Sequence, residues 1–171
     1  MRGYFGIGSE RISKAMNLGA VLRTAHAFNA SFVFTVNALH KVREIERADT
    51  SIADQHVPRY DWATIDEMRL PKGCVLVGIE LDDRAVSLPT FRHPPQAAYL
   101  LGPEKGSLSP ESVAACDFLV KIPTKFCVNL SVAAAIVMYD RQLSLGGFGD
   151  RTRAHAGAPP PVADWPVRGR R

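Results

Sequence analysis

The sequence is poor in cysteine and lacks the residue spacings that bind metals. Only three cysteines occur in 171 residues, an odd number, and they lie mostly within apolar segments. We therefore predict reduced thiols, as in a cytosolic protein, and no disulfide framework. No CxxC, HExxH or HxxxH is present, and the five histidines are scattered. A structural or catalytic metal site is not expected.

Long apolar runs and glycine-rich nucleotide motifs are also missing. No stretch approaches the roughly 18 apolar residues of a membrane span, and the opening segment MRGYFGIGSE lacks the apolar core of a signal peptide. We predict no membrane association and a cytoplasmic location. Neither GxGxxG nor GxxxxGK(S/T) occurs, so the sequence gives no support to an ordinary dinucleotide-binding fold or a P-loop NTPase.

Charge is distributed unevenly along the chain. The net charge is +4, and residues 148–171 hold five arginines against two aspartates in a segment rich in glycine and proline. Such a composition cannot bury a core. We predict a folded domain over residues 1–147 and a disordered tail over 148–171 that is dispensable for folding. A basic tail can bind polyanions or simply aid solubility, and the sequence leaves both open.

Apolar strands alternate with helices through the rest of the chain. Strands are expected at residues 2–7, 31–36, 74–79, 97–101 and 118–120. Helices are expected to begin near Asn17, Trp62, Ser109 and Asn129, with the second ending near Met68. Residues 41–54 indicate a surface helix or loop, and residues 81–95 an irregular connection. Strands that are apolar throughout, alternating with helices, indicate an α/β fold with a parallel sheet covered on both faces.

Three of the expected strand-to-helix junctions carry residues suited to a site. Ligands of open α/β sheets bind beyond the carboxyl ends of the strands. One junction holds Asn17 and Arg23, a second holds Glu104 between two glycines that let backbone approach a ligand, and the third spans residues 122–131. Each also has a plain structural explanation. Arg23 fits a solvated surface residue, Glu104 an exposed turn carboxylate, and Asn129 a helix cap.

Taken together, the three stretches resemble the motifs of the SPOUT superfamily, specifically the SpoU/TrmH branch of RNA ribose 2′-O-methyltransferases. The first stretch is NLGAVLRTAHAF at residues 17–28, and the second is LGPEKGSLS at 101–109. The third is IP at 122–123, followed by VNLSVAAAI at 128–136. Their order and spacing make the resemblance strong, and it spans roughly residues 3 to 145.

The resemblance implies a parallel α/β domain with a C-terminal trefoil knot, whose loops bind S-adenosylmethionine. It also implies a homodimer with the site near the interface. The family's active-site positions are matched by Asn17, Arg23, Glu104 and Asn129. The expected cofactor-binding residues are Ile79, Glu80, Gly102, Ile122, Cys127, Val128 and Leu130. The chain resembles the minimal members that consist of the catalytic domain, which suggests tRNA more than rRNA as the substrate.

The implied reaction requires a ribose 2′-hydroxyl to attack a methyl group on a sulfonium. The protein must orient that hydroxyl and prepare it electrostatically. By resemblance Arg23 either helps to deprotonate the hydroxyl, or binds an adjacent phosphate and stabilises the developing alkoxide. A guanidinium normally stays protonated, so the second role is physically easier, but the sequence does not choose between them.

Two other functions fit parts of the sequence. A non-catalytic RNA-binding protein can keep the knotted fold, although the presence of Arg23, Glu104 and Asn129 together favours the enzyme. A flavodoxin-like nucleotide-binding module shares the strand pattern but leaves the first motif unexplained.

Overall fold

The computed structural model describes residues 3–39 and 57–146. Its elements, in chain order, are β1 (Tyr4–Glu10), α1 (Ala15–Ala27), β2 (Phe32–Val36), β3 (Arg59–Trp62), β4 (Val75–Ile79), β5 (Val86–Ser87), the short 3-10 helix η3 (Leu88–Thr90), β6 (Gln96–Leu101), α2 (Pro110–Ala115), β7 (Phe118–Lys121) and α3 (Leu130–Ser144). The predictions made for residues 41–54 and for the tail at 148–171 fall outside the described residues.

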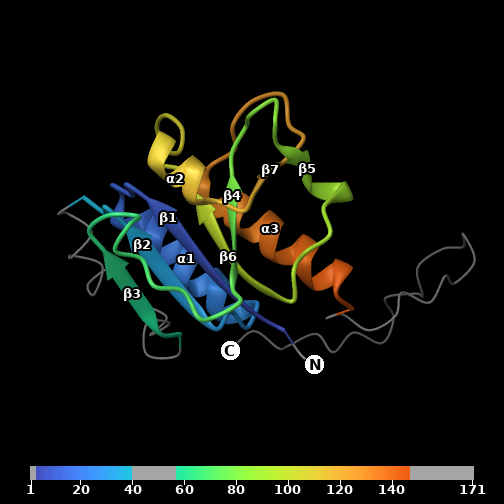
Figure 1. Cartoon of the computed structure of the whole chain (residues 1–171), viewed down its shortest axis with the longest axis horizontal. Helices are drawn as coiled ribbons and strands as arrows, with labels where there is room; N and C mark the ends of the chain where they lie inside the picture. Colours follow the sequence, from blue (N-terminus) through green and yellow to red (C-terminus); the bar gives the residue numbers. More distant parts are fainter. Residues whose placement is uncertain (1–2, 40–56, 147–171) are drawn as a thin grey trace, which may run out of the picture.

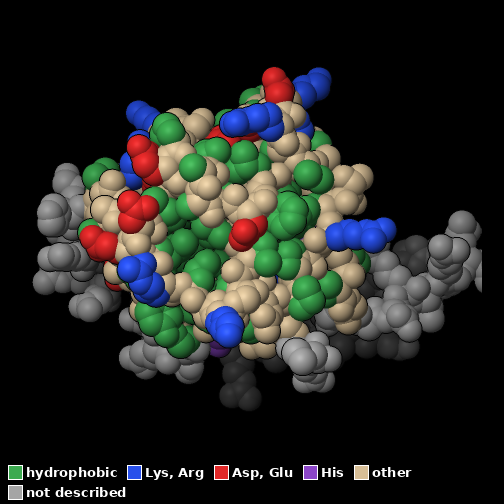
Figure 2. Space-filling model, viewed as in Figure 1, with side chains coloured by type: hydrophobic (Ala, Val, Ile, Leu, Met, Phe, Trp, Pro, Cys, Tyr) green, Lys and Arg blue, Asp and Glu red, His purple; other side chains and the backbone are tan. Residues whose placement is uncertain are grey.

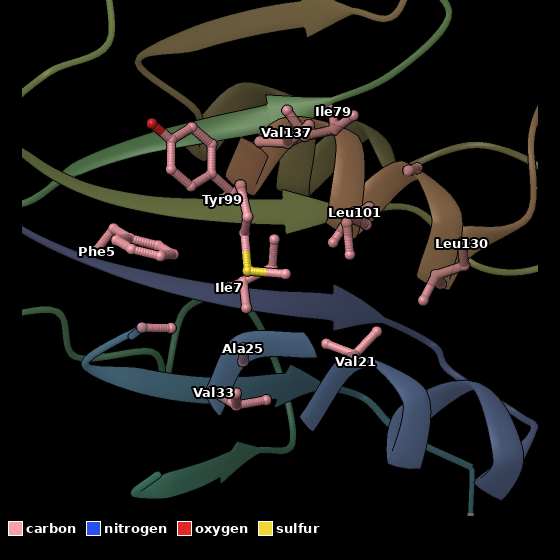
Figure 3. Close-up of a cluster of buried hydrophobic side chains, with 14 of the residues drawn as sticks. Phe5, Ile7, Val21, Ala25, Val33, Ile79, Tyr99, Leu101, Leu130 and Val137 are labelled. Carbon is pink, nitrogen blue, oxygen red and sulfur yellow. The ribbon is translucent and has the colours of Figure 1, made fainter. Parts of the chain in front are cut away.

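The seven strands form one sheet in the order β3-β2-β1-β6-β4-β7-β5, and every neighbouring pair is parallel (Figure 1). Successive side chains of a strand point to opposite faces. One face, which includes Ile7 and Tyr99, packs against α1 and α3, as Figure 3 shows. The other face, which includes Phe34 and Leu100, packs against α2 and the segment 62–74. The parallel α/β sheet covered on both faces, predicted from the sequence, is therefore confirmed.

The two long helices follow their local sequence signals. In α1 the apolar residues Leu18, Val21, Leu22 and Ala25 recur at helical spacing and are buried. Asn29 closes this segment with a left-handed backbone, φ 58°, a conformation that asparagine tolerates better than most residues. Helix α3 begins after Asn129, whose side-chain oxygen accepts a hydrogen bond from the backbone N–H of Ser131 at 2.9 Å. Both helix ends are thus set by residues adjacent in sequence.

The helix predicted over Trp62 to Met68 does not form. Trp62 instead ends strand β3, and turns follow it. The reason is tertiary packing. The rings of Tyr60 and Trp62 stack with centroids 5.9 Å apart, and they lie 6.1 Å from Phe32 and 5.8 Å from Phe34 of β2, respectively. Aromatic pairing across strands stabilises the sheet here and outweighs a short helical pattern.

Two glycines of β1 provide the space for this aromatic cluster. A Cβ atom placed on Gly6 would lie 2.2 Å from the ring of Phe32, and one on Gly8 would lie 2.3 Å from the backbone oxygen of Phe34. Both distances are too short for a non-bonded contact, so neither glycine position can carry a side chain. The glycine positions therefore let β2 lay its aromatic rings across the neighbouring strand.

Smaller differences occur at two other segments. The connection over residues 81–95, predicted to be irregular, contains β5 and η3. Helix α1 begins at Ala15, two residues before the predicted start at Asn17. Asn17 therefore lies inside the first turn, and 8% of its surface is exposed. Asn17 therefore does not cap the helix, and its side-chain amide hydrogen-bonds to residues of other segments.

Strand β7 lies in the sheet between β4 and β5, although β4 and β5 follow each other in the chain. The chain reaches β7 only after it has passed through β6 and α2 (Figure 1). Residues 118–121 thus separate two strands joined by the short connection at residues 80–85. The segment after β7 then leads along the carboxyl end of the sheet into α3.

A buried arginine ties α3 to the amino end of the sheet. Arg141 is 3% exposed. Its guanidinium donates to the backbone oxygens of Pro94 at 2.6 Å and Pro95 at 2.7 Å, and to the Tyr99 hydroxyl at 3.1 Å. The same group lies 5.1 Å from the centroid of the Phe5 ring. These partners satisfy a charge that is costly to bury alone.

His93 extends this network. Its Nδ1 lies 2.6 Å from the Tyr99 hydroxyl, and its Nε2 lies 2.9 Å from a carboxylate oxygen of Asp140. Burial lowers the pKa of His93, although the hydrogen bond and charge of Asp140 oppose that shift. Burial also raises the pKa of Tyr99 to about 12. We call Arg141, His93, Tyr99 and Asp140 the amino-end network.

The surface shows no sign of a bilayer-spanning element in the part of the chain that the structure describes. None of its helices combines the length and the hydrophobicity that crossing a membrane requires. On the face drawn in Figure 2, most lysine, arginine, aspartate and glutamate side chains lie toward the periphery, and hydrophobic side chains are scattered across the middle.

Candidate cofactor and active site

A pocket of about 240 Å³ opens at the carboxyl ends of the central strands. It lies where the three junctions singled out in the sequence meet. Its lining includes every residue expected to bind a cofactor: Ile79, Glu80, Gly102, Ile122, Cys127, Val128 and Leu130. It also includes three of the four residues expected to be catalytic, namely Asn17, Glu104 and Asn129. Folding thus brings together stretches far apart in the sequence.

Glu104 joins the second junction to the first. One of its carboxylate oxygens accepts hydrogen bonds from the backbone N–H of Lys14 at 3.0 Å and from the side-chain amide of Asn17 at 3.1 Å. The other accepts from the backbone N–H of Ser13 at 3.1 Å and from the Ser13 hydroxyl at 3.0 Å. Glu104 is therefore no free turn carboxylate, because it fixes the segment that leads into α1.

The same contacts determine the ionisation state of Glu104. Partial burial favours the neutral acid, but the hydrogen bonds from Asn17 and from backbone amides outweigh it and lower the pKa of the carboxyl group. Glu104 is thus ionised at neutral pH. Among the described residues it has no arginine, lysine or histidine within ion-pair distance.

Asn129 joins the third junction to the other two. Its amide donates to the side-chain oxygen of Asn17 at 3.4 Å. Its own oxygen accepts from the Ser131 backbone N–H at 2.9 Å and from the Ser131 hydroxyl at 2.7 Å. The helix cap occupies the oxygen of Asn129, so its NH₂ group must face Asn17. Asn17 in turn must point its NH₂ group at Glu104, and both amide orientations are fixed by their partners.

These contacts form a directed chain from Asn129 through Asn17 to Glu104, which we call the carboxyl-end network. Each amide NH₂ group carries two hydrogens, and one contact to a described residue accounts for only one of them. Since both asparagines line the pocket, a second N–H of each is available to a bound molecule. The arrangement can hold a hydroxyl or stabilise a developing negative charge.

Arg23 stands apart from this group. It is exposed on α1 and does not line the pocket. It follows Asn17 by six residues, which is about 9 Å along a helix axis and a different helical face. No hydrogen bond or ion pair holds its side chain among the described residues. The structure therefore brings together Asn17, Glu104 and Asn129, and leaves Arg23 outside their pocket.

A model of the SpoU rRNA Methylase family matches residues 5–139. The chain belongs to this family. A tRNA (guanosine(18)-2′-O)-methyltransferase of Thermus thermophilus is 28% identical over 154 residues, which cover 84% of this chain and 78% of the relative. The resemblance that the sequence motifs indicate is confirmed.

Solved structures share the fold. The SpoU methyltransferase AviRb of Streptomyces viridochromogenes, in complex with AdoMet, superposes with a TM-score of 0.74 at 20% identity, covering 86% of this chain and 63% of that chain. A second solved structure, which concerns the 2-OH methylation of C/U34 on tRNA, superposes with a TM-score of 0.70 at 25% identity. That match covers 86% of this chain and 100% of the other. This chain therefore spans less than two thirds of AviRb but the full length of the second protein.

The pocket of this SpoU-family chain has further lining residues that were not assigned a cofactor-binding or catalytic role from the sequence. They are Lys14, Leu81, Leu101, Pro103, Gly106, Thr124 and Ala133. Leu101, Pro103, Gly106 and Ala133 lie inside the quoted motifs, and Thr124 lies inside the third junction, so their positions were available as a signal. Lys14 precedes the first motif and Leu81 follows Glu80. No local pattern marks Lys14 or Leu81, because each reaches the pocket only through the course of its loop.

Two further carboxylates hold the loop at residues 102–109 in place. Glu80 accepts from the backbone N–H of Leu108 at 2.7 Å. The buried Glu10 accepts from the backbone N–H and the hydroxyl of Ser109 at 2.8 and 2.6 Å, and from the Ser112 hydroxyl at 2.9 Å. The glycine-containing loop is thus fixed from the last residue of β1 and from the residue that follows β4, as well as through Glu104. A site held by such contacts is preorganised for its ligand.

The lining of the pocket suits a molecule with a flat apolar part and a polar part. Its apolar side chains include Ile79, Leu101 and Leu130, while backbone and amide groups of the three junctions supply polar contacts. Gly106 has φ +92°, and a Cβ there would meet nothing within 4 Å, so this loop keeps open space beside the pocket. No group of three histidine, cysteine or acidic residues that suits a metal is found within residues 3–39 and 57–146.

Proposed function

We propose that this protein is an S-adenosylmethionine-dependent RNA methyltransferase that modifies a ribose 2′-hydroxyl, with tRNA as its substrate. The observation that carries the proposal is that residues of all three family motifs line one pocket and that Glu104, Asn17 and Asn129 are hydrogen-bonded to one another in its lining. Family membership supports the reaction class. The relative from Thermus thermophilus and the solved structure that concerns C/U34 methylation on tRNA both support tRNA over rRNA as the substrate. A cytoplasmic location of this protein is part of the proposal, because it would give the enzyme access to tRNA.

The residues present fit S-adenosylmethionine. Ile79, Leu101 and Leu130 would hold its apolar parts, and residues near Gly102 and Val128 offer backbone groups for its polar parts. When bound, the cofactor supplies an activated methyl group. Asn17 and Asn129 present amide hydrogens on the same pocket wall, where they can orient an incoming hydroxyl. Glu104 holds Asn17 in that orientation and is a positioning residue.

Arg23 would bind the phosphate next to the reactive ribose and stabilise the developing alkoxide. Arg23 is exposed and does not line the pocket of its own chain. The site is then completed by Arg23 from a second copy of the protein. The homodimer expected from the sequence would then be required for activity, because each site would need a residue from both chains.

Exposed apolar side chains give this second copy a surface to bury. Met16 on α1 is 78% exposed, and Val132 and Leu143 on α3 are 48% and 40% exposed. Helices α1 and α3 pack against each other beside the pocket. Association through these helices would cover the apolar residues and bring the partner's α1 close to the pocket.

Mixing two inactive variants tests the shared site. Arg23→Ala and Asn129→Ala should each lose most activity, by about 100-fold for Arg23→Ala. In a mixed dimer with Arg23 acting across the interface, one of the two sites keeps both wild-type residues, and activity returns. If Arg23 acts within its own chain, every site of the mixed dimer lacks one residue and activity stays low. Light scattering on each sample checks that dimers are present.

We also propose that the chain forms the trefoil knot of its superfamily. The support is the place of β7 between β4 and β5, which requires residues 118–130 to pass the connection at residues 80–85. An experimental structure traced continuously over residues 75–146 tests this topology. A chain that passes outside the 80–85 connection would contradict it.

The reaction itself is tested by incubating the purified protein with S-adenosylmethionine and unmodified tRNA or rRNA, followed by mass spectrometry of the nucleosides. The proposal expects a 2′-O-methylated nucleoside in tRNA. Calorimetry should show that S-adenosylmethionine binds and that its demethylated product competes. Binding of RNA with neither cofactor binding nor methyl transfer would instead favour the non-catalytic RNA-binding protein.

A further inference from the structure

Lys14 is a cation that the fold holds at the pocket while giving its side chain no partner. Its backbone N–H donates to Glu104 at 3.0 Å, and its carbonyl accepts from the Asn17 N–H at 3.0 Å. The backbone is therefore fixed on both sides. Lys14 lines the pocket, and its exposed side chain makes no hydrogen bond or ion pair with the residues the structure describes.

The position of Lys14 is unfavourable for the helix that follows. Lys14 is the N-cap of α1, where serine, threonine, aspartate and asparagine are preferred, and its side chain makes no capping hydrogen bond. A positive charge at a helix N-terminus also opposes the helix dipole. The first turn holds no acidic residue to offset it. Residues that break local rules without a structural gain concentrate at functional sites.

We infer that Lys14 binds a backbone phosphate of the substrate RNA beside the methylated ribose and so positions the target nucleotide. This inference rests on the proposed function. The ribose that reaches the pocket carries a phosphate on each side, and a lysine is a flexible point charge suited to such a group. With Arg23 of the second copy on one phosphate, Lys14 of the first provides a cation for the other. Lys14 is thus a positioning residue for RNA.

The decisive variant is Lys14→Ser, which removes the charge and introduces a good N-cap. Its melting temperature should equal or exceed that of the wild type, because the helix gains a cap and loses an unfavourable charge. Its KM for RNA should rise roughly five- to tenfold at 0.1 M salt, the effect of losing one phosphate contact, and the salt dependence of RNA binding should become shallower by about one contact. Lys14→Arg should retain most of the RNA affinity.

Lys72→Ser is the matched control. Lys72 is also an exposed lysine, but it precedes β4 at the opposite end of the sheet. The substitution removes the same charge, and KM for RNA should stay within twofold of the wild type. Equal losses in the two variants would show only a general effect of net charge and would overturn the inference.

Two further outcomes separate the alternatives. An unchanged KM for RNA in Lys14→Ser, with active wild-type protein, overturns the role of Lys14 and leaves the proposed function intact. Weaker S-adenosylmethionine binding in calorimetry, with unchanged RNA affinity, would assign Lys14 to the cofactor carboxylate instead and would also overturn it. A wild-type protein that methylates no RNA refutes the proposed function itself. RNA binding by that protein, measured directly, still decides the role of Lys14.

Discussion

Two polar networks lie at opposite ends of the same sheet, and they differ in whether they leave hydrogen-bonding groups free to bind a ligand. The amino-end network is closed. Arg141 and His93 are 3% and 5% exposed, and their hydrogen bonds end on Tyr99, Asp140 and backbone oxygens. The carboxyl-end network of Glu104, Asn17 and Asn129 is only partly buried and lines a pocket.

The difference separates stability from function. In a closed network every polar group has a protein partner, so removing one member leaves buried groups unsatisfied. In the open network both carboxylate oxygens of Glu104 accept hydrogen bonds from the segment that leads into α1, while each amide nitrogen keeps a second hydrogen for a ligand. Changes at the amino end should therefore act on folding, and changes at the carboxyl end mainly on the reaction.

Arg141→Met gives the largest expected effect. The substitution keeps much of the apolar stem but removes the guanidinium that satisfies the oxygens of Pro94 and Pro95 and the Tyr99 hydroxyl. We expect the free energy of unfolding to fall by about 3–5 kcal/mol in denaturant titrations. The exposed Arg92, mutated to Met, is the control and should change stability by no more than about 0.5 kcal/mol. A small loss at Arg141 would mean that the amino-end network is not structural.

Asn17→Asp tests the open network. It places a second carboxylate where the amide nitrogen lies 3.1 Å from Glu104, and two such carboxylates repel each other unless they share a proton. Methyl transfer at neutral pH should fall by about 100-fold or more, whereas the fold should persist. Lowering the pH should restore part of the activity as the pair takes up one proton. Activity that stays near wild type at neutral pH would show that the Asn17–Glu104 contact does not position the site.

The pH dependence of stability should carry the signature of His93. Burial lowers its pKa in the folded protein below the ordinary 6.5, so the unfolded chain takes up the proton first. The contribution of His93 to stability is then complete above pH 6.5 and declines as the pH falls through 6.5 toward the folded-state pKa. His93→Gln should remove this decline. Unfolding free energies measured from pH 7.5 to 5 check it, and identical slopes in both proteins would contradict it.

Glu104 should act in a more acidic range and with the smallest effect. Its pKa in the folded protein lies below the ordinary 4.5, so its contribution is present above pH 4.5 and is lost as the pH falls through the folded-state value. Wild type and Glu104→Gln should therefore differ in unfolding free energy at pH 7 and converge below pH 4.5. A difference that does not depend on pH would show that the charge of Glu104 is unimportant for folding.

The sequence by itself determined the local elements of this protein. The apolar stripe of α1, the left-handed Asn29 and the Asn129 cap all depend on residues within a few positions of one another. The Asn129 cap was predicted from the sequence and is confirmed. The strand pattern indicated the parallel sheet for the same reason. Ten of the eleven expected site residues line one pocket, because the carboxyl ends of parallel strands meet at one edge of the sheet.

Only the tertiary structure decided which side chains meet. Asn17 contacts Glu104 across 87 residues and Asn129 across 112 residues of chain, and no local pattern encodes such pairs. Strand β3 replaced a predicted helix because aromatic rings of β2 were there to receive Tyr60 and Trp62. The same holds for Lys14, whose place at the pocket results from the loop that Glu104 holds. Local order follows from neighbouring residues, whereas the partners of a polar side chain depend on the topology that carries distant segments together.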